Sequence, residues 1–226
     1  MKKIFIDCDP GHDDMMALML ASASDELELM GVTTVAGNQT GEKTFYNAQQ
    51  ILTLINARQL PLARGADKPL LRELTVAPKI HGKSGLDGAV LPKPAIEVKN
   101  IHAMDLIIRT CMESEEKIIL VPTGPLTNVA LSLLKAPEIT KKIERIVLMG
   151  GAVYDSNITP AAEFNIYVDP EAAKIVFECG LPLTMIGLDV TNKALMTFEE
   201  IEELLKLKGP VSGIAAPLLK FFAQTN

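Results

Sequence analysis

Short apolar segments typical of buried strands alternate along this chain with longer segments typical of helices. Most of the helical segments stand between two strand segments, which is the pattern of βαβ crossovers and of a parallel sheet. We therefore predict an α/β fold, with a mostly parallel sheet that carries helices on both faces. Predicted strands cover residues 4–6, 27–35, 60–63, 118–121, 146–149 and 183–186. Predicted helices cover residues 15–21, 42–57, 102–112, 126–134, 170–178, 198–207 and 211–222.

Four carboxylates are crowded between the first predicted strand and the first predicted helix, at Asp7, Asp9, Asp13 and Asp14. Ligands bind at this edge of open α/β sheets. Asp13 and Asp14 could simply complement the helix dipole, but one acid would suffice for that. Ionised carboxylates this close raise one another's pKa unless a cation neutralises them. The oxygen ligands favour Ca²⁺ or Mg²⁺ over Zn²⁺.

Composition excludes several classes of protein. The 28 acidic residues exceed the 22 basic ones, so there is no electrostatic footprint for nucleic acid. No segment reaches the roughly 18 uncharged apolar residues of a membrane span, and the apolar run after Lys3 is too short for a secretory signal. The cysteines, Cys8, Cys111 and Cys179, are odd in number and lack metal-type spacing, so reduced thiols and a cytoplasmic location are expected.

Two long irregular stretches, residues 66–100 and 152–169, interrupt the alternation. Compact domains rarely keep loops of this length without a use. The first stretch contains His81 within residues 80–88, where three glycines permit a mobile or tightly turned backbone. We predict that residues 80–88 form an active-site flap.

Five motifs together resemble the inosine-uridine-preferring nucleoside hydrolase family. They are the Asp-rich stretch 7–14, residues 35–38, residues 123–128, residues 149–151, and residues 163–165 with 169–172. The resemblance covers essentially the whole chain and is closest to the pyrimidine-specific members. It implies a Rossmann-like nucleoside hydrolase fold and a hydrolase that cleaves the N-glycosidic bond of ribonucleosides to free base and ribose. It also implies a role in nucleoside salvage, with Ca²⁺ as cofactor and a nucleoside as the small-molecule partner.

The resemblance further implies a role for individual residues. Asp9 and Asp14 coordinate Ca²⁺ together with the main-chain carbonyl of Thr123, and Asp9 also takes the proton of the Ca²⁺-bound water. Asp7 supports these groups rather than binding the cation. The substrate-binding residues are Asp13, Asn38, Asn157, Glu163 and Asn165.

Simpler interpretations of these residues stay open at this point. Thr123 could cap the helix that follows it, and Asn38 could be a turn residue after Gly37. The polar residues Asn157, Glu163 and Asn165 would ordinarily be solvated turn residues.

Three histidines occur in the chain. His102, at the start of a helix, is expected to be structural. His81 lies in a glycine-flanked loop, where an imidazole could protonate or hydrogen-bond a leaving base, and we assign it as a catalytic residue. The same base-facing role is open for His12. His81 and His12 resemble the pyrimidine-preferring members, so pyrimidine nucleosides are slightly favoured as substrates.

The sequence departs from the family pattern at its carboxyl-terminal end. The family runs beyond residue 226 and supplies a later His-Asp pair, so we interpret residues 1–226 as a single nucleoside hydrolase domain without that carboxyl-terminal segment. Truncation and a natural remnant are the two interpretations. The alternatives in function are a metal-dependent phosphohydrolase and an inactive metal- or nucleoside-binding remnant. The resemblance also implies a homo-oligomer, either a dimer or a tetramer.

Overall fold

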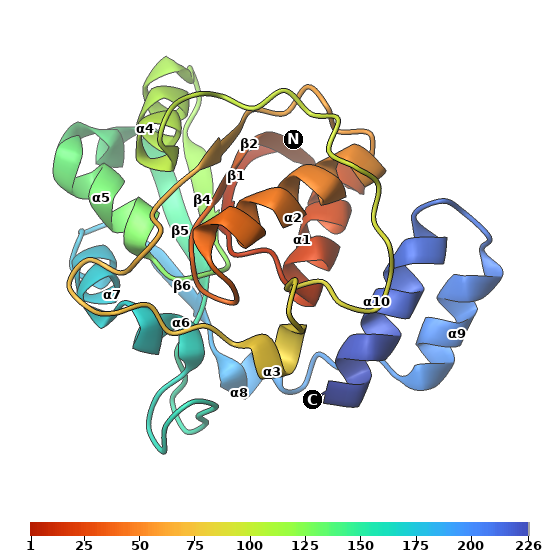
Figure 1. Cartoon of the computed structure of the whole chain (residues 1–226). Helices are drawn as coiled ribbons and strands as arrows, with labels where there is room; N and C mark the ends of the chain where they lie inside the picture. Colours follow the sequence, from red (N-terminus) through yellow and green to blue (C-terminus); the bar gives the residue numbers. More distant parts are fainter. Residues whose placement is uncertain (226) are drawn as a thin grey trace.

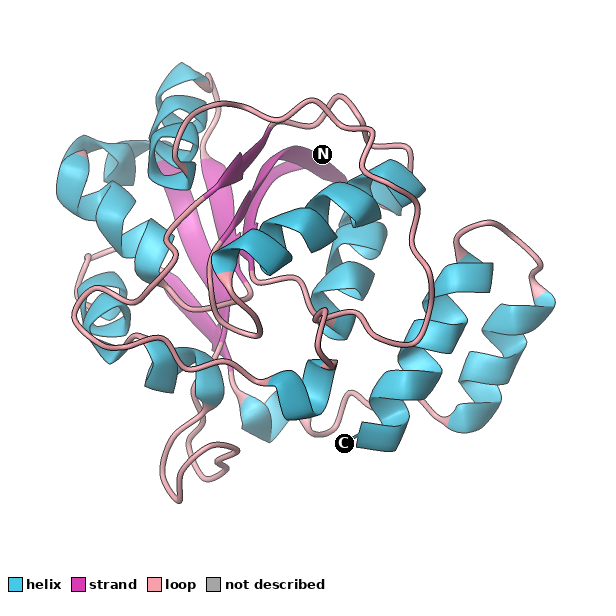
Figure 2. Cartoon of the chain, in the orientation of Figure 1, coloured by secondary structure: helices cyan, strands magenta, loops and turns pink. Residues whose placement is uncertain are grey.

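Six parallel strands form one sheet at the centre of the computed structural model, which describes residues 1–225 (Figures 1 and 2). Their spatial order is β3-β2-β1-β4-β5-β6, and every neighbouring pair is parallel. The strands are β1 (Lys2–Cys8), β2 (Leu27–Thr34), β3 (Leu62–Arg64), β4 (Ile118–Pro122), β5 (Ile143–Met149) and β6 (Leu183–Ile186). The predicted α/β fold with a parallel sheet is confirmed.

Helices cover both faces of this sheet (Figure 1). The helices of the βαβ crossovers are α1 (His12–Ala23), α2 (Gly41–Leu54), α4 (Ala103–Glu113), α5 (Thr127–Lys135) and α7 (Pro170–Phe177). Side chains of α1 and α2 belong to one buried apolar cluster, and those of α4, α5 and α7 belong to another. The central strand β1 separates the two clusters, because Phe5 faces the second cluster while Ile4 and Ile6 face the first.

Several short elements were not predicted from the sequence. They are α3 (Pro78–His81), the 3₁₀ helix η1 (Pro137–Lys142), α6 (Phe164–Val168) and α8 (Leu188–Thr191). Each has only four to six residues, too few for a helical period to stand out in the sequence. Helix α2 ends at Leu54, three residues before the predicted end, and β3 begins two residues later than predicted.

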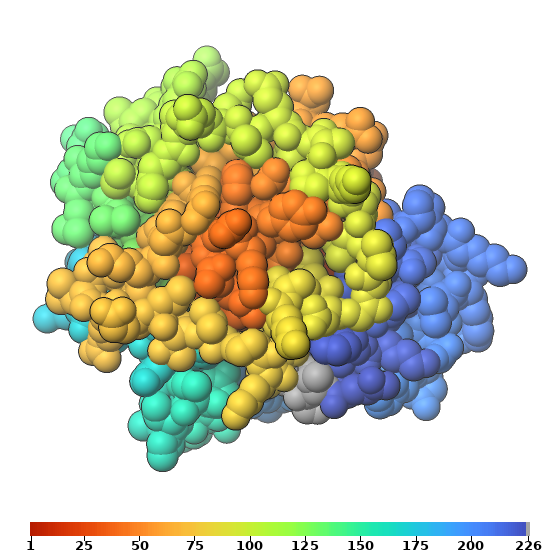
Figure 3. All heavy atoms as spheres, in the orientation of Figure 1, coloured from red at the N-terminus to blue at the C-terminus, as the bar shows by residue number. Residues whose placement is uncertain are grey.

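Two further helices, α9 (Phe198–Lys206) and α10 (Ser212–Thr225), pack against each other beside α1 (Figures 1 and 3). Ala215 and Leu218 of α10 join the apolar cluster of α1 and α2. The end of α10 lies against α3 and the flap, which are yellow in Figure 3 next to the dark blue helix. Within residues 1–225, no helix is both long and apolar enough to cross a membrane.

Candidate active site

The loops that leave β1, β2, β4 and β5 converge at one edge of the sheet. Strand β1 lies between β2 and β4, so the crossovers on its two sides run in opposite directions along the sheet. This reversal leaves a crevice at the carboxyl ends of the strands, which is the usual ligand site of such sheets. The loops bring Asp9, Asn38, Thr123 and Asn165 to this edge, each from a different strand end.

Asp9 is the most confined carboxylate of the crevice, with 1% of its surface exposed. Its Oδ2 accepts a hydrogen bond of 2.7 Å from the backbone N–H of Asn38, whereas its Oδ1 has no hydrogen-bond partner among the described residues. A Cβ atom added to Gly37 or Gly124 would lie 2.2 or 2.5 Å from these oxygens, so the backbone closes on both sides of the carboxylate. Burial, and then the charge of Asp14, raise the pKa of Asp9 well above its usual value.

Asp14 is the second buried carboxylate, one turn into α1. Its Oδ1 accepts a hydrogen bond of 2.6 Å from the hydroxyl of Thr123, and its Oδ2 accepts one of 3.1 Å from the N–H of Gly11. Asp14 therefore does cap the helix, as the simpler interpretation held, but it also contacts the loop after β4. Burial, and then the charge of Asp13, raise the pKa of Asp14 to about 7.

Thr123 does not cap the following helix, because the N-cap of α5 is Leu126 and that helix has no side-chain cap. The hydroxyl of Thr123 binds Asp14 instead. Its carbonyl oxygen accepts a hydrogen bond of 2.9 Å from Nδ2 of Asn165. Nδ2 of Asn165 also lies 3.2 Å from the carbonyl of Met149, so Asn165 joins the ends of β4 and β5.

Asp7 lies under the crevice, at the end of β1. Its Oδ1 accepts hydrogen bonds from the hydroxyl of Thr33 over 2.7 Å and from Nδ2 of Asn128 over 2.8 Å, while its Oδ2 has no partner among the described residues. Burial raises the pKa of Asp7 to about 6, although both hydrogen bonds oppose the shift. This position is compatible with the prediction that Asp7 supports Asp9 and Asp14 rather than binding the cation.

Glu163 and Asn157 stand apart from the two Asp side chains. Glu163 is the N-cap of α6, and its carboxylate accepts hydrogen bonds from the N–H groups of Asn165, Ile166 and Gly151 over 2.9–3.1 Å. Asn157 is exposed, and its Oδ1 accepts a hydrogen bond of 2.8 Å from Phe164 in the same loop. The structure does not bring Asn157 into contact with Asp9 or Asp14, and its role in substrate binding stays a prediction.

His81 and His12 meet on the other side of the crevice, where the flap covers the start of α1. Their Nδ1 atoms lie 3.4 Å apart, and both rings are buried. The exposed carboxylate of Asp13 lies close enough to favour the charged form of both rings, but burial is the larger effect and lowers the pKa of each histidine. His102 is the N-cap of α4, where its Nδ1 accepts a hydrogen bond from the N–H of Met104. This contact confirms the structural role predicted for His102.

The flap itself is tightly turned. The carboxylate of Asp87 accepts hydrogen bonds from the N–H groups of Lys83 and Ser84 over 2.8 and 3.0 Å. Nδ2 of Asn47 donates both to the carbonyl of Pro10 and to that of Ser84, over 3.1 and 3.0 Å, so α2 ties the flap to the Asp-rich loop.

The donor set of the crevice suits a hard cation. Asp9 has an unpartnered buried oxygen, Asp14 is the second carboxylate, and the carbonyl of Thr123 is the third oxygen. No group of three or more His, Cys, Asp or Glu side chains converges as a metal site within residues 1–225. A cation here would therefore depend on the carbonyl, and on water or substrate oxygens, beside the two carboxylates.

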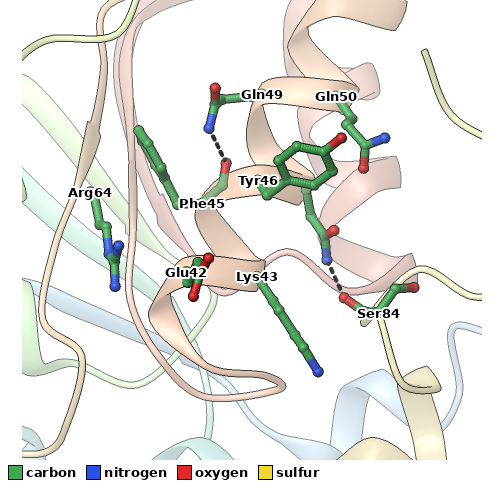
Figure 4. Close-up of a pocket in the computed structure, with 9 residues that line it drawn as sticks. Glu42, Lys43, Phe45, Tyr46, Gln49, Gln50, Arg64 and Ser84 are labelled. Carbon is green, nitrogen blue, oxygen red and sulfur yellow. Dashed lines mark hydrogen bonds between the residues drawn. The ribbon is translucent and has the colours of Figure 1, made fainter. Parts of the chain in front are cut away.

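A separate surface depression of about 360 Å³ lies along α2, next to the flap (Figure 4). Tyr46, Gln50 and Arg64 line it, together with Lys43 and Ser84. None of the predicted site residues lines this depression.

Several residues of the site were missed in the sequence. They are His12 as the partner of His81, Asn128 and Thr33 as partners of Asp7, and Asn47 as the anchor of the flap. Asn128 is fully buried inside α5. The amide side chain of Asn128, directly before the apolar residues 129–131, was the available signal, because a buried amide needs hydrogen-bond partners.

Gly11 must be a glycine because another side chain approaches its backbone closely. Its φ of −105° is open to any residue, but a Cβ there would lie 2.6 Å from Nδ1 of His81 and 3.0 Å from Nδ2 of Asn38. We expect Gly11→Ala to displace the ring of His81 and to lower the free energy of unfolding by about 1–3 kcal/mol in urea denaturation.

The matched control is Gly213→Ala, because nothing lies within 4 Å of a Cβ added at this position of α10. This variant is expected to keep the stability of the protein or to raise it by up to about 1 kcal/mol. Equal destabilisation of the two variants would contradict the close approach described for Gly11.

Comparison with known proteins gives one consistent result. The family described as inosine-uridine preferring nucleoside hydrolase matches residues 4–226. The pyrimidine-specific ribonucleoside hydrolase RihA of Photobacterium profundum is 55% identical over 221 residues, which are 98% of this chain and 71% of that protein. The protein of the same name from Escherichia coli O127:H6 is 54% identical over the same shares of the two chains.

Solved structures agree with the sequence comparison. The purine-preferring ribonucleoside hydrolase from Gardnerella vaginalis superposes with a TM-score of 0.95 at 35% identity, over 99% of this chain and 72% of that one. The names of these similar proteins include both base preferences, so the backbone fold alone does not decide between purine and pyrimidine.

Proposed function

Because the chain belongs to the inosine-uridine preferring nucleoside hydrolase family, we propose that it uses the crevice around Asp9 to hydrolyse pyrimidine ribonucleosides. The chain is a ribonucleoside hydrolase, which cleaves an N-glycosidic bond and releases base and ribose. The family assignment places it among N-glycosidases rather than phosphohydrolases. The observation that carries the proposed mechanism is the buried carboxylate of Asp9, with one oxygen held and the other free.

Asp9 is the proposed proton acceptor. The N–H of Asn38 holds Oδ2, so Oδ1 is the oxygen left to receive a proton from the attacking water. As the water oxygen bonds to the anomeric carbon, its proton moves to Oδ1, and the C–N bond breaks with its electron pair going to the base.

The family is metal-dependent, and Ca²⁺ is the proposed ion. Asp9, Asp14 and the carbonyl of Thr123 would hold it, since they present hard oxygen ligands at one place. When bound, Ca²⁺ would neutralise the two carboxylates and lower the pKa of the nucleophilic water.

The ribose is proposed to bind next to these carboxylates, through its hydroxyl groups. Asn165 and Asn38 are held by hydrogen bonds to backbone carbonyls, so their side-chain oxygens are oriented in advance. The carboxylate of Glu163 has lone pairs left beyond its backbone contacts and accepts from a ribose hydroxyl. Asp13 and Asn157 are both exposed and complete the proposed set.

The activity is tested by measuring ribose released from uridine, cytidine, inosine and adenosine. We expect ribose release to be faster from uridine and cytidine than from inosine and adenosine. Chelation of Ca²⁺ should abolish this release. Turnover that chelation leaves unchanged would contradict the proposed role of the cation, and a purine preference would contradict the assignment to pyrimidines.

His81 is the proposed partner of the leaving base. We expect His81→Ala to lower kcat/KM for uridine by about 10²–10⁴-fold, because the base then leaves without help from an acid. The loss should be much smaller for nitrophenyl riboside, whose leaving group needs no proton.

Kinetics on both substrates make this a test of the role of His81. Equal losses would show instead that His81 supports the folding of the flap. The matched control is His102→Asn, since Asn also caps helices and His102 lies at the start of α4.

A homo-oligomer and a cytoplasmic location are also proposed. The homo-oligomer rests on the resemblance to the family. The cysteines are unpaired, and Cys8 and Cys111 are buried, as suits a reducing compartment. Light scattering on the purified protein tests the oligomer, which a monomeric mass would contradict.

A further inference from the structure

The imidazoles of His12 and His81 face each other edge to edge. Their ring centroids lie 5.6 Å apart, their planes differ by only 19°, and the two Nδ1 atoms lie between the rings at 3.4 Å. This arrangement is that of an N–H···N hydrogen bond, long in this state, between two nearly coplanar rings. The two histidines are 69 residues apart in the sequence, and the flap brings them together.

The backbone of the flap decides which ring donates. Nε2 of His12 lies 2.8 Å from the carbonyl oxygen of Asp87, and a carbonyl only accepts, so Nε2 carries the proton. His12 is fully buried and stacks on Phe221 and Phe222 of α10, an apolar setting that disfavours a charged ring. A neutral His12 with its proton on Nε2 presents a lone pair at Nδ1, so Nδ1 of His81 must be the donor.

The ring of His81 is confined on its other sides. The backbone of Gly11 approaches its Nδ1 and Cε1 so closely that a Cβ there would lie 2.6 and 2.7 Å from them. Phe222 stacks on His81 with a centroid distance of 5.4 Å. Contacts with His12, Gly11 and Phe222 therefore fix the plane of the ring.

We propose that His12 is a positioning residue, which holds the ring of His81 and fixes its neutral tautomer as Nδ1–H, so that Nε2 is the atom presented to the leaving base. The chain of contacts runs from the carbonyl of Asp87 through His12 to His81. In this neutral tautomer Nε2 of His81 carries no proton, so His81 donates to the leaving base only after Nε2 has taken up a proton from solvent. Because His12 accepts from Nδ1 of His81 in both forms, the ring of His81 does not turn during this exchange. The functional part of this proposal rests on the proposed role of His81.

Two substitutions of His12 separate its two contacts. His12→Asn keeps an acceptor oxygen near the position of Nδ1, whereas His12→Gln keeps a donor near the position of Nε2 but loses the acceptor for His81. We expect His12→Gln to lower kcat/KM for uridine by roughly 10–100-fold, the usual effect of losing a partner that orients a histidine. His12→Asn should retain more activity, and both variants should lose less on nitrophenyl riboside. His102→Asn is expected to behave as the wild type.

The tautomer is measured directly on the free wild-type protein, from the ¹⁵N chemical shifts of its imidazoles. We expect Nδ1–H for His81 and Nε2–H for His12. A neutral His81 with its proton on Nε2 would overturn the proposal. So would an equal decrease in kcat/KM for His12→Asn and His12→Gln, of the same size on uridine and on nitrophenyl riboside.

The two levels of the proposal fail separately. If the wild-type protein releases no ribose from any nucleoside, the proposed function falls, while the chemical shifts still decide the pairing. If ribose is released but the shifts show the other tautomer, the proposed function stands and the role of His12 falls.

Discussion

Asp9→Asn is expected to lower kcat for uridine by about 10³-fold or more while the protein stays folded. The amide has nearly the shape of the carboxylate, so the space between Gly37 and Gly124 remains filled. It cannot take the proton of the attacking water, and it removes one charge from the proposed cation site. Ribose release measures the activity, and circular dichroism with urea denaturation measures the fold.

The stability of this variant provides a second observation. Burial raises the pKa of Asp9, so its charged form destabilises the metal-free protein, and the neutral amide should not lower the free energy of unfolding at pH 8. Asp67→Asn is the control, since Asp67 is exposed and pairs with Arg64 at the surface. Asp9→Asn with kcat close to the wild type would exclude Asp9 as the proton acceptor.

Removal of Ca²⁺ is expected to make the stability of the protein depend strongly on pH. The folded-state pKa values of Asp7 and Asp14 are raised from 3.8 to about 6 and about 7. Between pH 4 and 7 the folded state therefore binds more protons than the unfolded state, and the free energy of unfolding falls as pH rises. At about 1.4 kcal/mol per pKa unit, the two groups together give a decrease on the order of 6 kcal/mol between pH 4 and 8.

Calcium should reverse this loss mainly at high pH. Above pH 7 the carboxylates are ionised and free to bind the cation, and a ligand at 100 times its Kd adds about 2.7 kcal/mol. At pH 5 protons compete for Asp14, so the gain should be small. Urea denaturation at pH 5 and pH 8, with EDTA or with Ca²⁺, measures both effects.

Asp14→Asn is the matched variant for this experiment. It should flatten the pH dependence in EDTA and weaken the response to Ca²⁺. Mg²⁺ should stabilise the wild type less than Ca²⁺, because it demands a stricter geometry. A Ca²⁺ response of the same size at pH 5 and pH 8 would contradict the assignment of the buried carboxylates as its ligands.

The sheet and the Asp-rich loop could be predicted because their signals are local. An apolar run followed by Asp7, Asp9, Asp13 and Asp14 at the start of a helix carries its own strand, turn and helix signals within the first 21 residues. The contacts of Asn38 with Asp9 and of Thr123 with Asp14 then follow from parallel strands, whose carboxyl ends share one edge.

Other parts of the site depend on contacts that no local pattern contains. Asn128 meets Asp7 across 121 residues, and Thr123 meets Asp14 across 109. The pairing of His12 with His81 depends on α3, a single turn of helix in a stretch with no periodicity. Strand order likewise follows from packing between distant segments, so an alternating pattern predicts a sheet but not which strand lies at its centre.

The central place of β1 has a consequence for how this chain is synthesised. One edge of β1 pairs with β2, which follows within about 30 residues, but the other edge pairs with β4, which begins at Ile118. At typical rates of translation, β1 waits on the order of 10 s for that partner, with unpaired N–H and C=O groups along an apolar strand. The nascent chain is therefore most prone to aggregation during this interval. Asp9 cannot contact the loop after β4 until β4 and that loop have been synthesised.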